Sequence, residues 1–250
     1  MRNVILRTTV LAVAAAAVAV PAVAAVAPAA SAATATCLVV DTTSDYSYSS
    51  LQAAVSAAVS GDTLFVKGTC AGAGIGKNLT ISGQSASGVK TATLSGGGHG
   101  TVLTIDAGAT VTLNTLIVTD GTVAFGGGIL NGGTVTLDGI TVTGNTAFKS
   151  GGGIYNDGGT VTLNDSAVSN NTGDVGDFTG AFGGGGIYNT GLGTVIIGGG
   201  STVTGNSATA PGEGGGIYNA CGSTLVGAVA GAGGNVYGNT YEDIVDATGC

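Results

Sequence analysis

The sequence is poor in charge and contains no Trp, and these shortages exclude several classes of protein. Only 8% of its 250 residues are charged, and there are three Pro, one His and one Met. Long amphipathic helices need charged faces that this chain does not supply. Disorder requires low hydrophobicity and high charge, whereas 44% of the residues are hydrophobic. Collagen is excluded because Pro is scarce and Gly does not recur at every third position.

Glycine is what the chain has in excess. Its 49 Gly are about three times the usual share. Thr and Val are also frequent, and both are residues that favour strands. The composition therefore predicts an all-β architecture with many turns.

The first 32 residues have the pattern of a secretory signal peptide. Two Arg give a basic start, an apolar run covers Thr8–Val20, and Ala30–Ala32 forms a small-residue cleavage site. The alternative is an uncleaved anchor helix, since Val10–Ala30 is long enough to span a bilayer. Two Pro and an Ala-rich end favour cleavage. We therefore predict a secreted protein, extracellular or at the cell surface, with no membrane contact after cleavage.

Cleavage would leave a strongly acidic chain. Four Lys would remain against 14 Asp and Glu, a formal net charge of −10, and no Arg. Phosphate groups are contacted chiefly by Arg and Lys, so nucleic acid and anionic membrane surfaces are not expected partners.

A repeat occupies the middle and the end of the chain. The segment GGGIL at Gly126–Leu130 recurs three times as GGGIYN, with Ile-to-Ile spacings of 25, 33 and 30 residues. Each copy precedes a strand-like run such as TVTL and then a V-x-x-N element. The GGGIYN copies are Gly151–Asn156, Gly184–Asn189 and Gly214–Asn219; the strand-like runs are Thr110–Leu113, Thr134–Leu137, Thr160–Leu163, Thr194–Ile197 and Ser223–Val226; the V-x-x-N elements end at Asn145, Asn171, Asn206 and Asn239.

Each unit thus contains three short β segments separated by turns. In TVTL the Val and Leu share one face and the two Thr share the other, which is the alternation of a half-buried strand. Units this short must stack on identical neighbours to bury their apolar face. The repeat therefore predicts a parallel β-helix of about six three-strand coils. Asn114, Asp138 and Asn164 follow the second strand and are interpreted as turn residues that tolerate a left-handed backbone.

The ends of the solenoid are expected to be capped and cross-linked. The stretch 49–60 is the one convincing helix and would cover the N-terminal end. About six coils separate the two ends by about 25–30 Å, whereas a disulfide needs Cα atoms within about 7 Å. The four Cys therefore predict two local disulfides, Cys37–Cys70 and Cys221–Cys250.

The paired GGGIYN and V-x-x-N signals resemble the repeats of polymorphic outer-membrane proteins and related secreted right-handed parallel β-helix proteins. The resemblance covers 126–239 well and 74–121 loosely, and the N-terminal helix with its GDT strand resembles the cap of pectin-lyase-like proteins. Because this sequence lacks the C-terminal barrel segment of the outer-membrane group, the resemblance is not expected to extend to membrane insertion or autotransport. The resemblance implies a right-handed solenoid and secretion, while such folds host adhesins, lyases and hydrolases alike. The expected organisation is a signal peptide at 1–32, a cap at 33–74, the β-helix at 75–240 and a disulfide-closed tail at 241–250.

Two units are lengthened at the same place, between V-x-x-N and the next GGGIYN, which marks a candidate working face. Under an enzymatic hypothesis its carboxylates serve a glycoside hydrolase, or Lys149 is the base of a lyase with Ca²⁺ held by the carboxylates. His99 sits in a Gly-rich turn, and the strands carry almost no charge, so no confident catalytic residue, metal site or cofactor is predicted. The catalytic candidates are Lys149, Asp174, Asp177 and Glu213.

A binding hypothesis uses aromatic residues of the same region. If the column that begins with Leu130 faces outward, its Tyr stack beside the insertions and suit the faces of sugars; if it faces inward, the Tyr belong to the core. The candidate ligand-binding residues are Tyr155, Tyr188, Tyr218, Phe178 and Phe182.

Outward Thr pairs suggest a third hypothesis, the match of a regular Thr array to an ice surface. Ile196 breaks that array, and Thr is in any case a good exposed strand residue. The leading hypothesis is a monomeric, non-catalytic structural or adhesive protein that contacts a polysaccharide or cell-surface glycan. The alternative is a carbohydrate-active lyase or hydrolase.

Overall fold

The computed structural model describes residues 36–86, 89–90, 92–173, 183–209 and 213–247. The chain divides into two units, Met1–Ala33 and Thr34–Cys250, and all described residues belong to the second.

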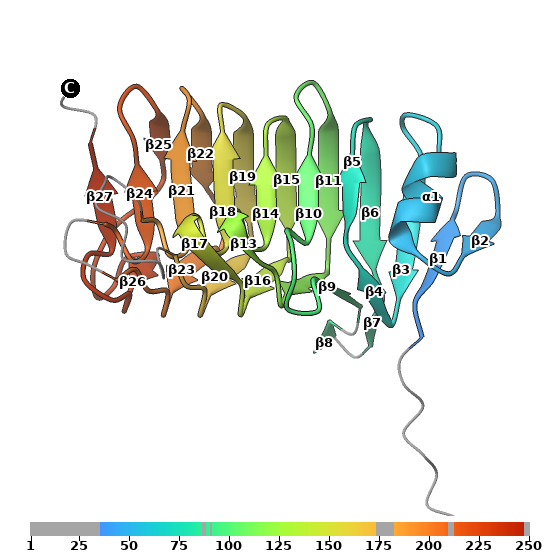
Figure 1. Cartoon of the computed structure of the whole chain (residues 1–250), viewed down its shortest axis with the longest axis horizontal. Coiled ribbons are helices and arrows are strands. Elements are labelled where there is room, and N and C mark those ends of the chain that lie inside the picture. The colour runs from blue at the N-terminus through green and yellow to red at the C-terminus, as the bar shows by residue number, and fades with distance from the viewer. Residues whose placement is uncertain (1–35, 87–88, 91, 174–182, 210–212, 248–250) are drawn as a thin grey trace, which may run out of the picture. The chain divides into compact units, whose positions relative to one another are not determined.

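Three long sheets make up the second unit, and they run side by side along it (Figure 1). Sheet A contains, in spatial order, β2 (Tyr46–Tyr48), β1 (Leu38–Asp41), β3 (Thr63–Lys67), β6 (Leu79–Gly83), β11 (Thr110–Asn114), β15 (Thr134–Asp138), β19 (Thr160–Asn164), β22 (Thr194–Ile197) and β25 (Thr224–Val226). Sheet B contains β26 (Val236–Tyr237), β23 (Thr202–Thr204), β20 (Ala167–Ser169), β16 (Thr141–Thr143), β12 (Ile117–Thr119), β9 (Thr93–Ser95) and β4 (Thr69–Ala71). Sheet C contains β27 (Ile244–Asp246), β24 (Ile217–Asn219), β21 (Ile187–Thr190), β18 (Ile154–Asp157), β14 (Ile129–Asn131), β10 (Leu103–Ile105) and β5 (Ala73–Ile75).

Two short strand pairs lie outside these sheets. The strands β13 (Thr122–Phe125) and β17 (Thr146–Ser150) are parallel, and β7 (Ser85–Ala86) and β8 (Val89–Lys90) are antiparallel. Neither pair was expected from the sequence.

The chain visits the three sheets in a fixed rotation. Strands β10, β11 and β12 belong to sheets C, A and B, and β14, β15 and β16 repeat that order one rung further along. Equivalent residues of successive repeats pair without a shift, as Val111 does with Val135 and Val135 with Val161. This arrangement confirms an all-β, solenoid-like fold of stacked repeats.

The alternation seen in the sequence separates the core from the surface. Val111 and Leu113 are fully buried, whereas Thr110 is exposed and Thr112 is half-buried. The inward residues of all three sheets join in one apolar core that runs through the solenoid. Burial of this core supplies the main stabilising free energy, at about 25 cal/mol per Å² of apolar surface.

The GGG runs make the tight turn that leads into sheet C. Gly151 has a φ of +67°, and a Cβ there would lie 2.5 Å from the carbonyl oxygen of Ile154. A side chain is therefore excluded both by the left-handed backbone and by the close approach of the following strand.

Two ladders of Asn, all buried except the half-buried Asn239, run along the inside of the solenoid. In the first, the Nδ2 of each Asn donates to the Oδ1 of the Asn one rung further on, at 2.7–2.8 Å. The second ladder has the same direction, with distances of 3.0 Å. Both end on an Asp carboxylate. The first ladder is Asn131, Asn156, Asn189, Asn219 and Asp246, and the second is Asn145, Asn171, Asn206, Asn239 and Asp243.

The turn after sheet A differs in one detail from the sequence interpretation. Asn114, Asp138 and Asn164 are the last residues of their strands. The positive φ falls one residue later, at Thr115 (+52°), Gly139 (+59°) and Asp165 (+45°). The left-handed position was therefore wrong by one residue, because the strand continues in register through the polar residue.

The N-terminal end is covered by the helix α1 (Leu51–Ala57). The Ser50 side chain accepts a hydrogen bond from the Ala53 N–H, and the Lys77 Nζ donates to the Ala58 carbonyl at 2.8 Å, so each end of the helix gains a capping hydrogen bond. The buried face of α1 consists of Leu51, Ala54 and Val55. The helix is shorter than the predicted stretch 49–60 but lies at the expected end.

The disulfide Cys37–Cys70 ties this cap to sheet B, with the two Cα atoms 4.6 Å apart. This part of the disulfide prediction is confirmed. Cys221 carries no free thiol, and its predicted partner Cys250 lies outside the described residues.

Candidate functional site

The lengthened segments all connect a sheet B strand to a sheet C strand, and we call this side of the solenoid the insertion edge. In the two shorter segments that take the same place in the preceding repeats, the chain forms β13 and β17, which pair with each other. Thr146 pairs with Thr172, and Thr172 pairs with Ser207, so the later segments begin in the same register. The insertion edge is therefore a continuation of the repeat and not a set of unrelated loops.

A column of Tyr lies on the outer face of sheet C beside this edge. The strands β18, β21 and β24 pair in register, so Tyr155, Tyr188 and Tyr218 are neighbours on successive rungs. Ile154 and Ile187, which alternate with the Tyr, are fully buried in the core. The alternative in which the Tyr point inward is therefore excluded.

The three rings stack face to face and do not form one flat platform. Tyr155 and Tyr188 have ring centroids 5.3 Å apart and an interplanar angle of 7°, and Tyr188 and Tyr218 have values of 5.0 Å and 5°. Tyr188 and Tyr218 are only 9% and 8% exposed. We call Tyr155, Tyr188 and Tyr218 the Tyr stack; most of its ring surface is used inside the protein.

Burial of the Tyr stack changes its acidity. The pKa of Tyr188 is raised to about 12. Loss of hydration is the largest cause, and the nearby Tyr218 and Tyr155 add to it. Loss of hydration and then the Asp157 carboxylate raise the pKa of Tyr155. Both phenols thus stay neutral in ordinary conditions and can donate hydrogen bonds.

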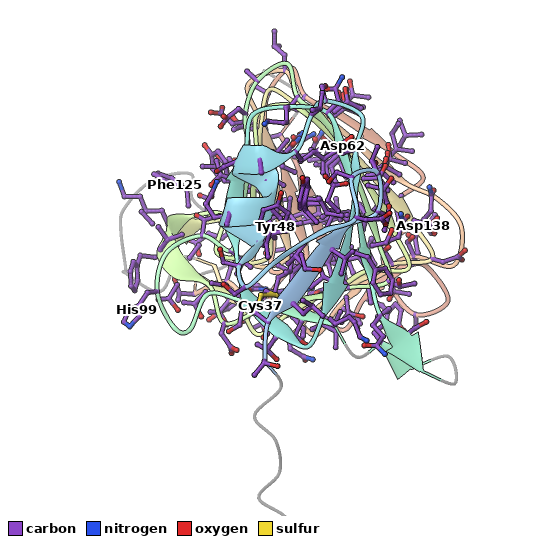
Figure 2. The ribbon with its side chains drawn as sticks, turned by 90° about the vertical axis from the view of Figure 1, so that its right-hand side faces the viewer. Cys37, Tyr48, Asp62, His99, Phe125 and Asp138 are labelled. Atoms are coloured by element: carbon purple, nitrogen blue, oxygen red, sulfur yellow. A yellow bond between two sulfur atoms is a disulfide. The ribbon has the colours of Figure 1, made fainter. Side chains whose placement is uncertain are left out.

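The accessible end of the stack is formed by Tyr155 with Phe125 and Lys149. The Phe125 ring meets the Tyr155 ring edge-on, with centroids 5.1 Å apart and an angle of 62°. The Lys149 Nζ lies 5.2 Å from the centroid of the Phe125 ring, within the range of a cation–π contact. All three residues are half-buried, and Phe148, which precedes Lys149 on β17, is 45% exposed. Figure 2 shows Phe125 on the same side of the unit as His99 and across from Asp138.

The catalytic candidates are only partly described. Lys149 stands on the strand β17 over Phe125, and Glu213 is buried next to Gly184, whose N–H donates to the Glu213 carbonyl. Asp174 and Asp177 lie outside the described residues, as do the aromatic candidates Phe178 and Phe182. Within the described ranges no group of three or more His, Cys, Asp and Glu could hold a metal ion.

The Thr pairs lie on the outer face of sheet A, away from this site. Thr112, Thr136 and Thr162 pair in register, and the column then continues with Ile196 and Val226. This column of the array is thus Thr on three of the predicted repeats and apolar beyond them, whereas the other column continues as Thr110, Thr134, Thr160, Thr194 and Thr224.

Sequence reasoning missed Phe125 and Asp157 as members of the site. Phe125 comes directly before the GGG run that begins at Gly126, and Ser150 comes directly before the one that begins at Gly151. This shared position was the available signal that Phe125 lies in register on the insertion edge. Asp157 directly follows IYN in a single repeat, so no column pointed to it.

Comparisons with known proteins give no relative. No family model matches the chain, and neither a curated protein nor a solved structure shows significant similarity to it. The resemblance to polymorphic outer-membrane protein repeats thus stays a prediction. In the part of the chain that the structure describes, no helix is long and apolar enough to cross a membrane.

Proposed function

We propose that this protein is a secreted, monomeric, non-catalytic structural or adhesive protein that binds a polysaccharide or cell-surface glycan at its insertion edge. In this proposal the solenoid is a right-handed parallel β-helix of about six coils, related to the polymorphic outer-membrane protein repeats. The seven parallel strands in each long sheet are close to that number. Right-handed connections between parallel strands are found in about 98% of cases, and a disulfide fits an oxidising compartment.

The observation that carries the proposal is the accessible end of the Tyr stack. Tyr155 and Phe125 present aromatic surface that is half open to solvent. Aromatic rings pack against the apolar faces of sugars, and a phenol or ammonium group beside them supplies hydrogen bonds. The rings are held by the repeat itself, so the surface is rigid before a ligand arrives. Such pre-organisation favours binding because little conformational entropy is lost.

The alternative is a carbohydrate-active lyase or hydrolase that uses Lys149, Asp174, Asp177 and Glu213, with Ca²⁺ only in the lyase version. It requires two carboxyl groups facing one another across a groove. Of its three carboxylates the described residues include only Glu213, which is buried. No geometry of the described site favours this alternative.

Binding of the purified protein to a glycan array tests the proposal, together with a reducing-end assay on pectin and on every glycan that binds. We expect binding without release of reducing ends. Tyr155→Ala and Phe125→Ala should each weaken binding by about tenfold, as loss of a central aromatic contact does in interfaces.

Tyr46→Ala is the matched control, because Tyr46 is 67% exposed on the strand β2, far along the chain from the insertion edge. It should bind like the unmodified protein. Turnover of a glycan, or equal binding by the Tyr155→Ala and Tyr46→Ala variants, would overturn the proposal.

A further inference from the structure

Two hollows on the outer face of sheet C join at one residue. The first, of about 340 Å³, is bordered by Gln52, Gly74, His99 and Thr104. The second, of about 300 Å³, is bordered by Thr104, Leu130 and the residues around Gly132. The hollows are neighbours along the solenoid axis, because Thr104 borders both and Gly74, Thr104 and Leu130 lie on successive rungs. We call the two together the sheet C groove.

The sheet C groove leads to the accessible aromatic residues. The outward column of sheet C passes from Gly74 to Thr104, Leu130 and Tyr155 on four successive rungs. At about 4.8 Å per rung, three steps cover about 14 Å, which is long enough for several linked sugar rings. A groove of this direction fits an extended polymer better than a compact small molecule.

Two glycines keep the groove open although their backbone does not require glycine. Gly74 and Gly132 are outside the set of residues with positive φ. A Cβ on Gly74 would meet nothing within 4 Å, and one on Gly132 would lie 3.5 Å from the Ala107 N, an ordinary contact. They differ in this from Gly151, where a Cβ would clash with backbone. The missing side chains at Gly74 and Gly132 have one visible consequence, which is the groove.

The charges along the groove are negative. Asp106 and Asp157 border the second hollow on either side of Gly132, and no Lys borders either hollow. Both carboxylates lean away from Gly132: the Asp106 Oδ2 lies 2.8 Å from the Cβ position of Gly76, and the Asp157 Oδ1 lies 3.2 Å from that of Gly191. The space between them is left free, and its rim repels anions.

We infer that the sheet C groove binds a linear glycan whose sugars carry amino groups and no carboxylates, with the ammonium groups of different sugars beside Asp106 and beside Asp157 and a sugar ring against Tyr155. The inference rests on the proposed function and names its ligand class. Uronic acids would place a carboxylate against this rim, and N-acetylation would remove the positive charge.

Titration calorimetry with glucosamine oligomers, their N-acetylated counterparts and oligogalacturonate tests the inference. We expect the glucosamine oligomers to bind most tightly and their affinity to fall with added salt. Gly132→Leu should lower it by at least about tenfold because the side chain fills the hollow. Asp106→Asn and Asp157→Asn should each lower it by about two- to fivefold, as expected for accessible ion pairs.

Gly198→Leu is the matched control, since Gly198 also lacks a positive φ and its Cβ would lie 3.4 Å from the Asn164 Oδ1, away from the groove. Thermal unfolding verifies that each variant is folded, and the two Asp→Asn variants decide the matter if Gly132→Leu does not fold.

The possible outcomes separate the inference from the proposed function. Binding that depends on Tyr155 but is unchanged in Gly132→Leu, or in both Asp→Asn variants, overturns the inference alone. So does oligogalacturonate binding as tightly as the glucosamine oligomers. Failure to bind any glycan overturns both.

Discussion

The Nδ2 of Asn219 donates to the Oδ1 of Asp246 at 3.1 Å, so a buried row of neutral amides ends on a carboxylate. The second ladder closes in the same way, from Asn239 to Asp243 at 3.0 Å. Along both ladders each amide donates to the next member on its C-terminal side, and each ladder ends on a negative charge, which is the stronger acceptor. In the second ladder each amide also donates back to a carbonyl of the preceding rung, as Asn145 does to Val118. At the other end the Asn131 Oδ1 is buried without a partner, because the rung before it carries Ile105.

A break in the middle of a ladder should destabilise the whole solenoid. Asn189 accepts from Asn156 and donates to Asn219, Gly193 and Thr224, and all of these contacts are inside the protein. We expect Asn189→Ala to lower the free energy of unfolding by about 2–4 kcal/mol, since buried partners are left unpaired on both sides. Urea denaturation measures this change.

The control for that variant is Asn164→Ala, because Asn164 ends a strand of sheet A and is half-buried. It should change the free energy of unfolding by no more than about 0.5 kcal/mol. If the two variants lost equal free energy of unfolding, an Asn in the ladder would contribute no more to stability than an Asn outside it.

The Tyr stack should make the protein sensitive to alkali. The pKa of Tyr188 rises from 10.0 to about 12 in the folded state, so its stabilising contribution is complete below pH 10 and is lost as the pH approaches 12. The loss amounts to about 2–3 kcal/mol at most. Unfolding measured at a series of pH values, with tyrosinate absorbance of the folded protein, records both effects.

Tyr188→Phe keeps the ring and removes the ionisable group. Its stability should therefore fall less steeply above pH 10 than that of the unmodified protein. Parallel pH dependences for the two proteins would contradict the assigned pKa.

The GGG turns should tolerate no side chain at their first position. Gly151→Ala places a Cβ 2.5 Å from the Ile154 oxygen at a φ of +67°, and we expect a loss of at least about 2 kcal/mol. Gly198→Ala, where the nearest contact is 3.4 Å, should be within about 0.5 kcal/mol of the unmodified protein. Thermal and urea unfolding compare the two, and similar stabilities would refute the steric argument.

The disulfide of the cap should contribute through the chain that it closes. Cys37 and Cys70 are 33 residues apart. Closing a loop of this length restricts the unfolded chain and should raise the free energy of unfolding by about 3–4 kcal/mol. The double variant Cys37→Ser/Cys70→Ser should therefore unfold at lower urea concentration. An unchanged urea midpoint would mean that α1 and β1 hold the cap without the cross-link.

The repeat allowed the sheets, the register and the capped end to be predicted, because Val111 and Leu113 recur at the same offsets in every unit. A period of two within each strand and a constant order of strands leave few other ways to bury those residues. The Cys37–Cys70 pairing followed from the same reasoning, since only neighbours in the stack come close enough.

The sequence alone could not predict whether Tyr155 points toward the core or toward the surface, because its neighbour Ile154 is apolar as well. The deciding residue is Asn156, which shares the inward face with Ile154 and is fully buried. A single Asn predicts a surface or a turn, and only its recurrence as Asn131, Asn156 and Asn189 makes burial favourable. The contact of Lys149 with Phe125 was out of reach for a different reason: the insertion-edge segments differ in sequence between repeats, so the repeat gives the place of Phe125 before a GGG run but not the side chain that lies over it.

The ladders also set how this molecule can change in length. Each internal Asn is bonded by an Asn one rung before it and bonds to another one rung after it. If a whole repeat were deleted or duplicated, the Asn on either side of the change would meet a partner identical to the one it lost. The chain can therefore lengthen or shorten in steps of one rung, while the α1 cap and the terminal carboxylates stay as they are.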